Sequence, residues 1–154
     1  MRTFVIALVM AAAALPAGLP EGVGHWTSGE LRGFEKILGP KINAQNVATQ
    51  PLASYGNHSF LMAHRQGSGE AELHETQHDV MVVESGEATL VVGGTVVDQK
   101  TTAPHEIRGP SIRGGEQVAL AAGDVVHIPI KTAHQMLVED GKQITYFVVK
   151  IDAR

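Results

Sequence analysis

Histidines and carboxylates cluster near the middle of this 154-residue chain, just ahead of an apolar run. Glu72 and His74 are two positions apart, and side chains of an extended segment alternate between faces, so both point to the same side. Residues 75–77 are predicted to form a turn, after which Asp79 and His78 lie on opposite faces of a strand. If the face of Asp79 is the interior one, Glu72, His74 and Asp79 converge on one point.

Imidazole nitrogen and carboxylate oxygen are ligand types that suit divalent transition metals such as Zn, Fe, Mn and Ni. A metal site is therefore one interpretation of this cluster. A second segment, residues 123–134, also carries two histidines, His127 and His134, with Pro129 between them.

The two segments together resemble the motifs of the cupin family, which read G-x5-H-x-H-x(3,4)-E-x6-G and G-x5-P-x-G-x2-H-x3-N. Four residues separate His74 from Asp79, and six separate Asp79 from Gly86, as in the first motif. Pro129 and His134 stand at the proline and histidine positions of the second motif. The resemblance runs from about Gly67 to the C-terminus.

This resemblance implies a divalent transition metal held by two carboxylates and two histidines. The implied ligands are Glu72, His74, Asp79 and His134. His78 stands at the shorter permitted spacing and is a rival for Asp79 as the fourth ligand.

The chain departs from the family pattern at four positions. Glu72 replaces a histidine, Asp79 a glutamate, Lys131 a glycine and Val138 an asparagine. Because carboxylate oxygen is harder than imidazole nitrogen, this set should favour Mn or Fe, or give a poorly selective Zn or Ni site. Loss of the metal is the alternative.

The implied fold is all-β, a double-stranded β-helix (jelly-roll or cupin barrel) over residues 44–154, with a short N-terminal helix in an extension over residues 18–43. The family includes dioxygenases, isomerases, decarboxylases, lyases and binding proteins, so the fold does not choose an activity. One interpretation is a metal-dependent oxygenase, isomerase or lyase acting on a small polar organic molecule. The others are a non-catalytic module that binds a small ligand or a metal, and a metal-free barrel that serves dimer contact. The resemblance also implies a possible homodimer.

Two further residues are candidates for proton transfer or substrate orientation. His127 lies in an otherwise apolar strand, where it either lines the cavity as an acid–base group or is a neutral structural histidine. Tyr146 alternates with Val148 on one face of the last strand. Its phenol either reaches the pocket or is buried with a hydrogen bond.

The N-terminus has the pattern of a secretory signal peptide over residues 1–17. Arg2 precedes an uncharged run over residues 3–14, and small residues follow around Ala17. The run is short for a membrane span. We therefore expect a secreted or periplasmic protein that has no membrane contact after cleavage.

Composition narrows the remaining classes. The chain is 44% hydrophobic and 18% charged, which favours a globular domain over a disordered one. The net charge is -4 and no basic cluster occurs, so we expect no nucleic-acid partner. There is no cysteine, which excludes disulfides and thiolate metal sites.

Local signals predict the outer elements. Residues 27–30 resemble a capping box, and apolar residues at helical spacing follow up to Gly39. Strands are predicted at residues 45–54 and 58–65, with Arg65 or His64 as a possible contact to an anionic substrate.

Three predictions concern the second half of the chain. Gly93 and Gly94 predict a hairpin between the strands on either side. Residues 99–116 are predicted to be an irregular connection or a lid, on which His105 and Arg108 could face a ligand. Residues 125–128 are predicted to be a buried strand.

Overall fold

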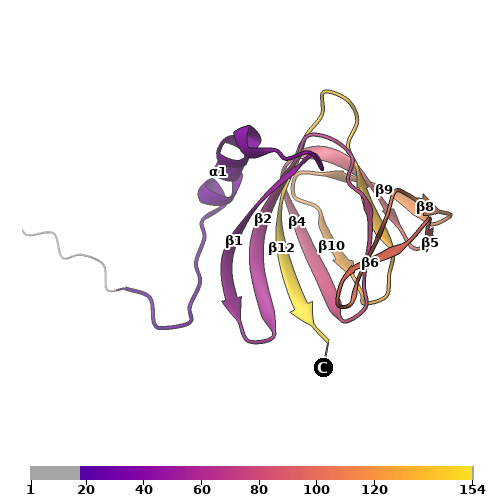
Figure 1. Ribbon diagram of the computed structural model, residues 1–154. Helices are drawn as coiled ribbons and strands as arrows, with labels where there is room; N and C mark the ends of the chain where they lie inside the picture. Colours follow the sequence, from indigo (N-terminus) through magenta and orange to yellow (C-terminus); the bar gives the residue numbers. More distant parts are fainter. Residues whose placement is uncertain (1–17, 154) are drawn as a thin grey trace, which may run out of the picture.

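The computed structural model describes residues 18–153, most of which form strands (Figure 1). The elements in chain order are α1 (Ser28–Leu38), the short 3-10 helix η1 (Gly39–Lys41), β1 (Val47–Tyr55), β2 (His58–Arg65), β3 (Ala71–His74), β4 (Gln77–Val92), β5 (Thr95–Val96), β6 (Lys100–Ala103), β7 (Glu106–Gly109), β8 (Ile112–Arg113), β9 (Glu116–Ala121), β10 (Val125–Ile128), β11 (His134–Leu137) and β12 (Ile144–Asp152). The expected signal peptide, residues 1–17, lies outside the described residues. No helix within residues 18–153 is long and apolar enough to span a bilayer.

The long strand β4 organises the sheet. Its first half pairs with β12 and β10, and its second half pairs with β11 and β9. Gly86 lies where the strand passes from one set of partners to the other, with a φ of 79°. A Cβ atom at this position would collide with the backbone carbonyl of Gln143, so both the conformation and the space call for glycine.

The ten-stranded sheet is antiparallel, and eight of its strands run in the order β1-β2-β12-β4-β11-β3-β7-β6. The other two, β9 and β10, pair with β4 beside this path. The sheet curls on itself so that strands distant in the sequence face each other across an interior (Figure 1). The expected all-β barrel of the jelly-roll type is confirmed. Its core is apolar and includes Met81, Leu90, Ile128 and Ile144, all buried.

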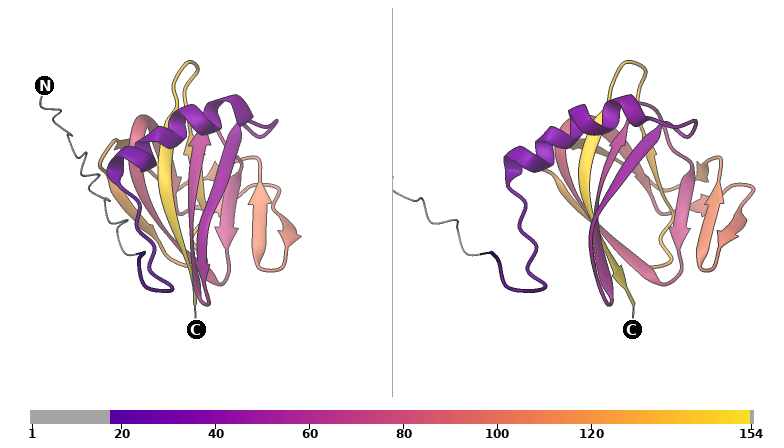
Figure 2. Two further views of the ribbon diagram at one scale, coloured as in Figure 1. Left: turned by 90° about the vertical axis from the view of Figure 1, so that its left-hand side faces the viewer. Right: turned by 60° about the vertical axis from the view of Figure 1, so that its left-hand side comes forward.

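The helix α1 starts where the sequence predicts. The Thr27 side chain accepts a hydrogen bond from the backbone N–H of Glu30, and the Glu30 carboxylate accepts one from the backbone N–H of Thr27. The helix packs outside the barrel near β2 and β12 (Figure 2). Leu38 is buried there against Met62, whereas Ile37 is 48% exposed.

His64 lies beneath this helix and not in the barrel. Its side chain is 1% exposed, and its Nδ1 lies 2.8 Å from the Thr145 hydroxyl. Strand alternation sends the next residue, Arg65, to the interior instead. Of the two residues named as possible substrate contacts, only Arg65 therefore reaches the barrel interior.

Three element predictions are wrong. The strands on either side of Gly93 and Gly94 do not pair with each other, because β5 pairs with β8. The segment predicted to be irregular contains the hairpin β6–β7, and β7 pairs with β3. In β10 only Ile128 is buried, and Val125 is 65% exposed, because one face of this strand is turned outward.

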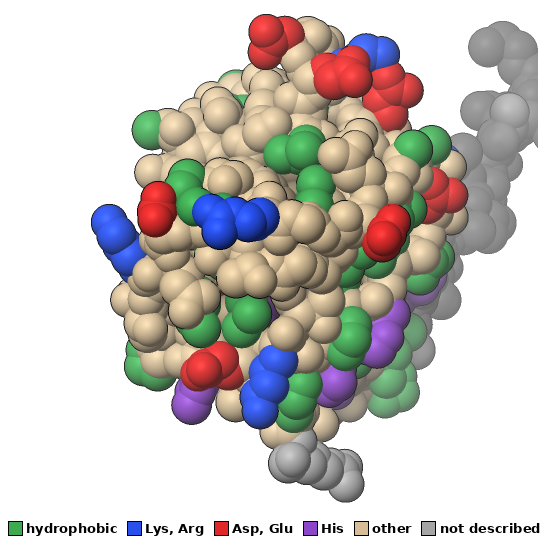
Figure 3. Space-filling model, turned by 90° about the vertical axis from the view of Figure 1, so that its right-hand side faces the viewer, with side chains coloured by type: hydrophobic (Ala, Val, Ile, Leu, Met, Phe, Trp, Pro, Cys, Tyr) green, Lys and Arg blue, Asp and Glu red, His purple; other side chains and the backbone are tan. Residues whose placement is uncertain are grey.

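The outer surface on the side of β5, β8 and β9 is mixed in charge. Acidic and basic side chains are scattered over it among single apolar residues (Figure 3). No single kind of side chain dominates this face.

Candidate metal centre and cavity

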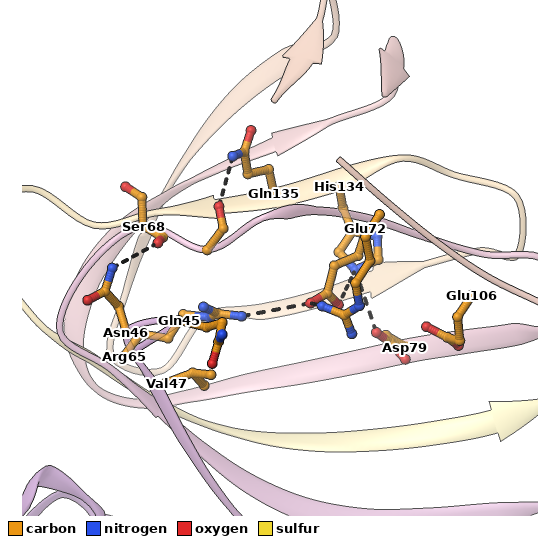
Figure 4. Close-up of polar contacts among 12 residues, drawn as sticks. Gln45, Asn46, Val47, Arg65, Ser68, Glu72, Asp79, Glu106, His134 and Gln135 are labelled. Atoms are coloured by element: carbon orange, nitrogen blue, oxygen red, sulfur yellow. Dashed lines mark hydrogen bonds and ion pairs between the residues drawn. The ribbon is translucent and has the colours of Figure 1, made fainter. Parts of the chain in front are cut away.

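Three neighbouring strands supply the four predicted metal ligands. Glu72 and His74 come from β3, Asp79 from β4 and His134 from β11. Pairing of β3 with β11 sets Glu72 opposite His134, so both side chains leave the sheet on the same face. Figure 4 shows Glu72, Asp79 and His134 gathered in one region of the interior.

Three of these residues form one close group of ligand atoms, and Asp79 lies against its two imidazoles. Glu72, His74 and His134 each offer one, all within 4.8 Å of one another. Oε2 of Glu72 is 3.7 Å from Nε2 of His74 and 3.8 Å from Nε2 of His134. Asp79 adds Oδ2, which is 3.3 Å from Nε2 of His74 and 3.8 Å from Nε2 of His134.

The hydrogen bonds of the two imidazoles direct their Nε2 atoms to the same centre. Nδ1 of His134 donates to the carbonyl oxygen of Thr132 at 3.1 Å, which leaves the lone pair of a neutral ring on Nε2. Nδ1 of His74 lies 2.8 Å from both carboxylate oxygens of Glu106 and donates to them. A carboxylate in this position orients a metal-ligating histidine and increases its basicity.

In each carboxylate of the group, one oxygen contacts a cation and the other faces the imidazoles. Oε1 of Glu72 accepts a hydrogen bond from Arg108 at 2.6 Å, while Oε2 faces the histidines. Oδ1 of Asp79 accepts one from Lys150 at 2.9 Å, while Oδ2 faces the same centre. Arg108 and Lys150 therefore fix the two carboxylates and leave one oxygen of each for an ion.

These contacts shift the titration of the acids. Burial raises the pKa of Glu72, but Arg108 and His134 more than offset this, so the pKa is lowered. Burial also acts to raise the pKa of Asp79, yet hydrogen bonds from His74 and Lys150 lower it to about 2. Both carboxylates are therefore ionised at neutral pH, as metal ligands must be.

The pKa values of the two imidazoles are shifted in opposite directions. Burial lowers the pKa of His134, which favours the neutral ring. Burial acts in the same way on His74 and is the largest single influence, but the hydrogen bond to Asp79 and the negative charges of Asp79 and Glu106 together outweigh it, so the pKa of His74 is raised.

A cavity of about 400 Å³ adjoins the group. Glu72, His74 and Asp79 line it, while His134 lines a much smaller space of about 20 Å³ next to it. Pockets of this size and mixed lining accept small organic molecules. Tyr146 lines both spaces and accepts a hydrogen bond from Nε of Arg65 at 3.1 Å, and burial raises the pKa of its phenol.

Two predicted residues do not reach this cavity. His127 pairs with Val80 across β10 and β4, so alternation places it on the outer surface, where it is exposed. Its ring stacks on that of His78, with centroids 5.6 Å apart. The expectation that His127 could line the cavity is therefore corrected, and His78, the rival of Asp79, also lies on the outer face.

Sequence reasoning missed two residues that contact the group directly. Lys150 follows Tyr146 and Val148 at a spacing of two, and this alternation was a signal that it shares their inward face. Its Nζ lies 3.3 Å from Nε2 of His74. Glu106 gave no such signal, because its position depends on the unexpected pairing of β7 with β3.

The two residues named for a lid over residues 99–116 lie in different places. Arg108 does face the cavity from β7. His105 instead stands in the turn between β6 and β7, with a largely exposed side chain that pairs with Glu75.

No protein-family model matches the sequence, and comparison with curated proteins finds no match. Solved structures do match. A Streptomyces PAC13 variant with uridine has a TM-score of 0.52 and 10% identity, covering 73% of this chain and 74% of that chain. TT1209 from Thermus thermophilus has a TM-score of 0.53 and 17% identity, covering 73% and 90%. KdgF from Halomonas sp. has a TM-score of 0.52 and 14% identity, covering 71% and 81%.

At these identities the similarity concerns the fold. The neighbours are cupin-like barrel proteins, and they share the curled antiparallel sheet that β4 organises here. This chain has the cupin fold.

Proposed function

We propose that this protein is an exported metal-dependent enzyme that acts on a small polar organic molecule. Glu72, His74, Asp79 and His134 would hold a divalent transition metal, with Mn, Fe, Zn and Ni as the candidates. The observation that carries the proposal is Nε2 of His134, which is buried, has no hydrogen-bond partner among residues 18–153, and faces oxygens of Glu72 and Asp79 at 3.8 Å. A buried nitrogen lone pair beside two carboxylates calls for a cation.

A divalent ion in such a site supplies Lewis-acid or redox chemistry to a bound ligand. The protein's own groups supply position and charge. Glu106 orients His74, while Arg108 and Lys150 hold the two carboxylates. Tyr146, fixed by Arg65 at the cavity wall, is the proposed group for proton transfer or orientation of the substrate.

The cavity supports a small ligand as substrate. Its volume of about 400 Å³ is near the lower end of the range for ligand pockets. PAC13, a nucleoside dehydratase of the same fold, has been crystallised with uridine. The candidate reactions for the present protein are those of an oxygenase, an isomerase or a lyase.

The deciding experiment is elemental analysis of protein purified without added metal. We expect about one transition-metal ion per chain in the wild type, and less than a tenth of that in His74→Ala and His134→Ala. His127→Ala is the matched control, because it removes an imidazole from the outer surface. Metal retained by both site variants, with unchanged circular dichroism spectra, would refute the site.

One observation favours a second candidate, a non-catalytic binding module without a metal. Nζ of Lys150 lies 2.9 Å from Asp79 and 3.3 Å from His74, so an ammonium already provides a cation at the edge of the group. In this case the wild type contains no stoichiometric ion and turns over no substrate, but still binds a small ligand in the cavity.

Export is proposed from the charged, apolar and small-residue pattern of residues 1–17. Mass spectrometry of protein recovered from outside the cytoplasm should show a chain that lacks these residues. Recovery of the full-length chain from the cytoplasm alone would contradict export.

A further inference from the structure

Three cationic side chains line the cavity beside the proposed ion. They are Arg65, Arg108 and Lys150. Arg65 is 8% exposed and is engaged by Tyr146 and Glu72. Arg108 and Lys150 are more open, with side chains 35% and 24% exposed. These two are therefore accessible to a ligand that enters the cavity.

The two more exposed cations, Arg108 and Lys150, have more N–H donors than their present contacts use. Arg108 makes one side-chain hydrogen bond within residues 18–153, to Glu72, although a guanidinium has five N–H donors. The ammonium of Lys150 contacts one oxygen of Asp79 and one nitrogen of His74, which leaves a third N–H. Each of the two cations is thus held beside a different proposed metal ligand, with donors left over for a further partner.

The charge balance of the cavity changes when an ion binds. Four carboxylates line it, Glu70, Glu72, Asp79 and Glu106, against the three cations. With neutral histidines the lining carries a net charge of minus one, so a divalent ion turns it into plus one. A single negative charge on the ligand would then neutralise the site, which a polar but uncharged ligand could not do.

This surplus of one charge favours a carboxylate over a phosphate. A carboxylate carries one negative charge, whereas a phosphate monoester carries about 1.5 to 2 at neutral pH and would leave a net negative charge beside four acids. The planar fork of Arg108 can bind two oxygens of a carboxylate or of a phosphate, so the preference between them rests on charge.

Part of the cavity lining is apolar. Val47, Leu61 and Val148 line it, from β1, β2 and β12. A ligand with an acidic end and a small carbon skeleton would therefore match both the cationic and the apolar parts of the lining.

We propose that the ligand of this cavity is a small organic acid, whose carboxylate is bound by Arg108 and Lys150 beside the metal. This assignment deepens the proposed function and rests on it for the charge of the bound ion. Arg65 acts behind these two residues as a positioning residue, because it contacts both Glu72 and Tyr146.

Isothermal titration calorimetry on the metal-loaded protein tests the assignment. The probes are small carboxylic acids of about two to eight carbons, their primary amides, and inorganic phosphate. We expect binding of at least one acid and at least tenfold weaker binding of its amide and of phosphate. Arg108→Gln and Lys150→Gln should each weaken binding of the acid by about tenfold or more. Arg113→Gln and Lys142→Gln, on surface positions outside the cavity, should leave it unchanged.

Arg108→Lys guards against a variant that fails to fold. It keeps a positive charge next to Glu72 but removes the planar fork. The variant should therefore bind the acid more weakly and have the melting temperature of the wild type. An amide or phosphate that binds as tightly as the acid, or unchanged binding by Arg108→Gln and Lys150→Gln, overturns the assignment.

The metal is measured separately in the same samples. If an ion is present and lost in His134→Ala, but no acid binds, the organic-acid assignment fails and the metal site stands. If no ion is present and the acid still binds through Arg108, the proposed metal function fails and the acid-binding site stands.

Discussion

Glu72 gives the site something that an imidazole could not. A histidine ligand would have one ring nitrogen for the ion and one for its own orienting partner, whereas a carboxylate has a second oxygen beside the first. Here that oxygen accepts the hydrogen bond from Arg108, which lines the cavity. The departure from the cupin motif at this position thus ties a proposed metal ligand to a proposed ligand-binding side chain.

The lowered pKa of Asp79 predicts how the metal-free protein responds to acid. The carboxyl titrates near 3.8 when unfolded and at about 2 when folded, so its ionised form stabilises the folded state above about pH 4. This contribution, about 2 kcal/mol, is lost as the pH falls through the folded value of about 2.

Urea denaturation in the presence of a chelator, between about pH 2 and pH 6, measures this contribution. The difference in unfolding free energy between wild type and Asp79→Asn should shrink as the pH falls. A difference that stays constant over this range would contradict the assignment.

Residue types and spacing were sufficient to nominate the members of the site but not their surroundings. Glu72, His74, Asp79 and His134 stood out because each is a ligand type at a motif position. Glu106 could not be found, because a single acid in an apparently irregular segment carries no local signal. Its distance of 2.8 Å from His74 is created by pairing between strands that lie far apart in the sequence.

At the scale of the element, the bend in β4 depends on Gly86. An alanine there would need a left-handed backbone conformation, which costs about 1 kcal/mol, and its Cβ would also meet the carbonyl of Gln143. We expect Gly86→Ala to reduce the unfolding free energy by about 2 kcal/mol or more, measured by urea denaturation.

Gly141→Ala is the control for backbone strain alone. Gly141 has a similar φ of 77°, but no atom of the described part of the chain lies within 4 Å of the position that a Cβ would take. It should lose only about 1 kcal/mol. Equal losses in the two variants would show that the close approach at Gly86 is unimportant.

Elements with local signals were predictable, and those defined by distant partners were not. The helix α1 follows from its capping box and apolar spacing, which lie within one segment. Gly93 and Gly94 gave an equally clear turn signal, and both do have positive φ values. The hairpin prediction was nevertheless wrong, because β5 pairs with β8, a strand further along the chain, in a separate two-stranded sheet.

For the whole molecule, the proposed ion would join β3, β4 and β11 at one point. Because these strands come together only in the folded state, an ion that binds there stabilises folding by mass action. We expect chelation to lower the melting temperature, by an amount equivalent to about 2.7 kcal/mol if the free ion had been about 100-fold above its Kd. Differential scanning calorimetry, with and without EDTA, measures the change.

His134→Ala provides the comparison for chelation. Without the β11 ligand, EDTA should have little effect on the melting temperature. A similar decrease in wild type and variant would place the bound ion elsewhere.

The barrel as a whole was predictable because its two motifs include the glycine and proline positions as well as the ligands. Gly86 and Pro129 restrict where strands bend and end, and they carry this information in a single sequence. For short strands such as β10, the sequence indicated less clearly which face points to the barrel interior. Alternation there gives two faces, but only the packed sheet decides which one contains His127.

The shared carboxylates of Glu72 and Asp79 imply that the proposed metal and the proposed acid would not bind independently. One oxygen of each carboxylate faces the proposed ion site, and the other accepts a hydrogen bond from a cavity cation. Occupancy by one guest therefore changes the electrostatic potential that the other encounters. By thermodynamic linkage, the factor by which the metal changes the affinity for the acid equals the factor by which the acid changes the affinity for the metal.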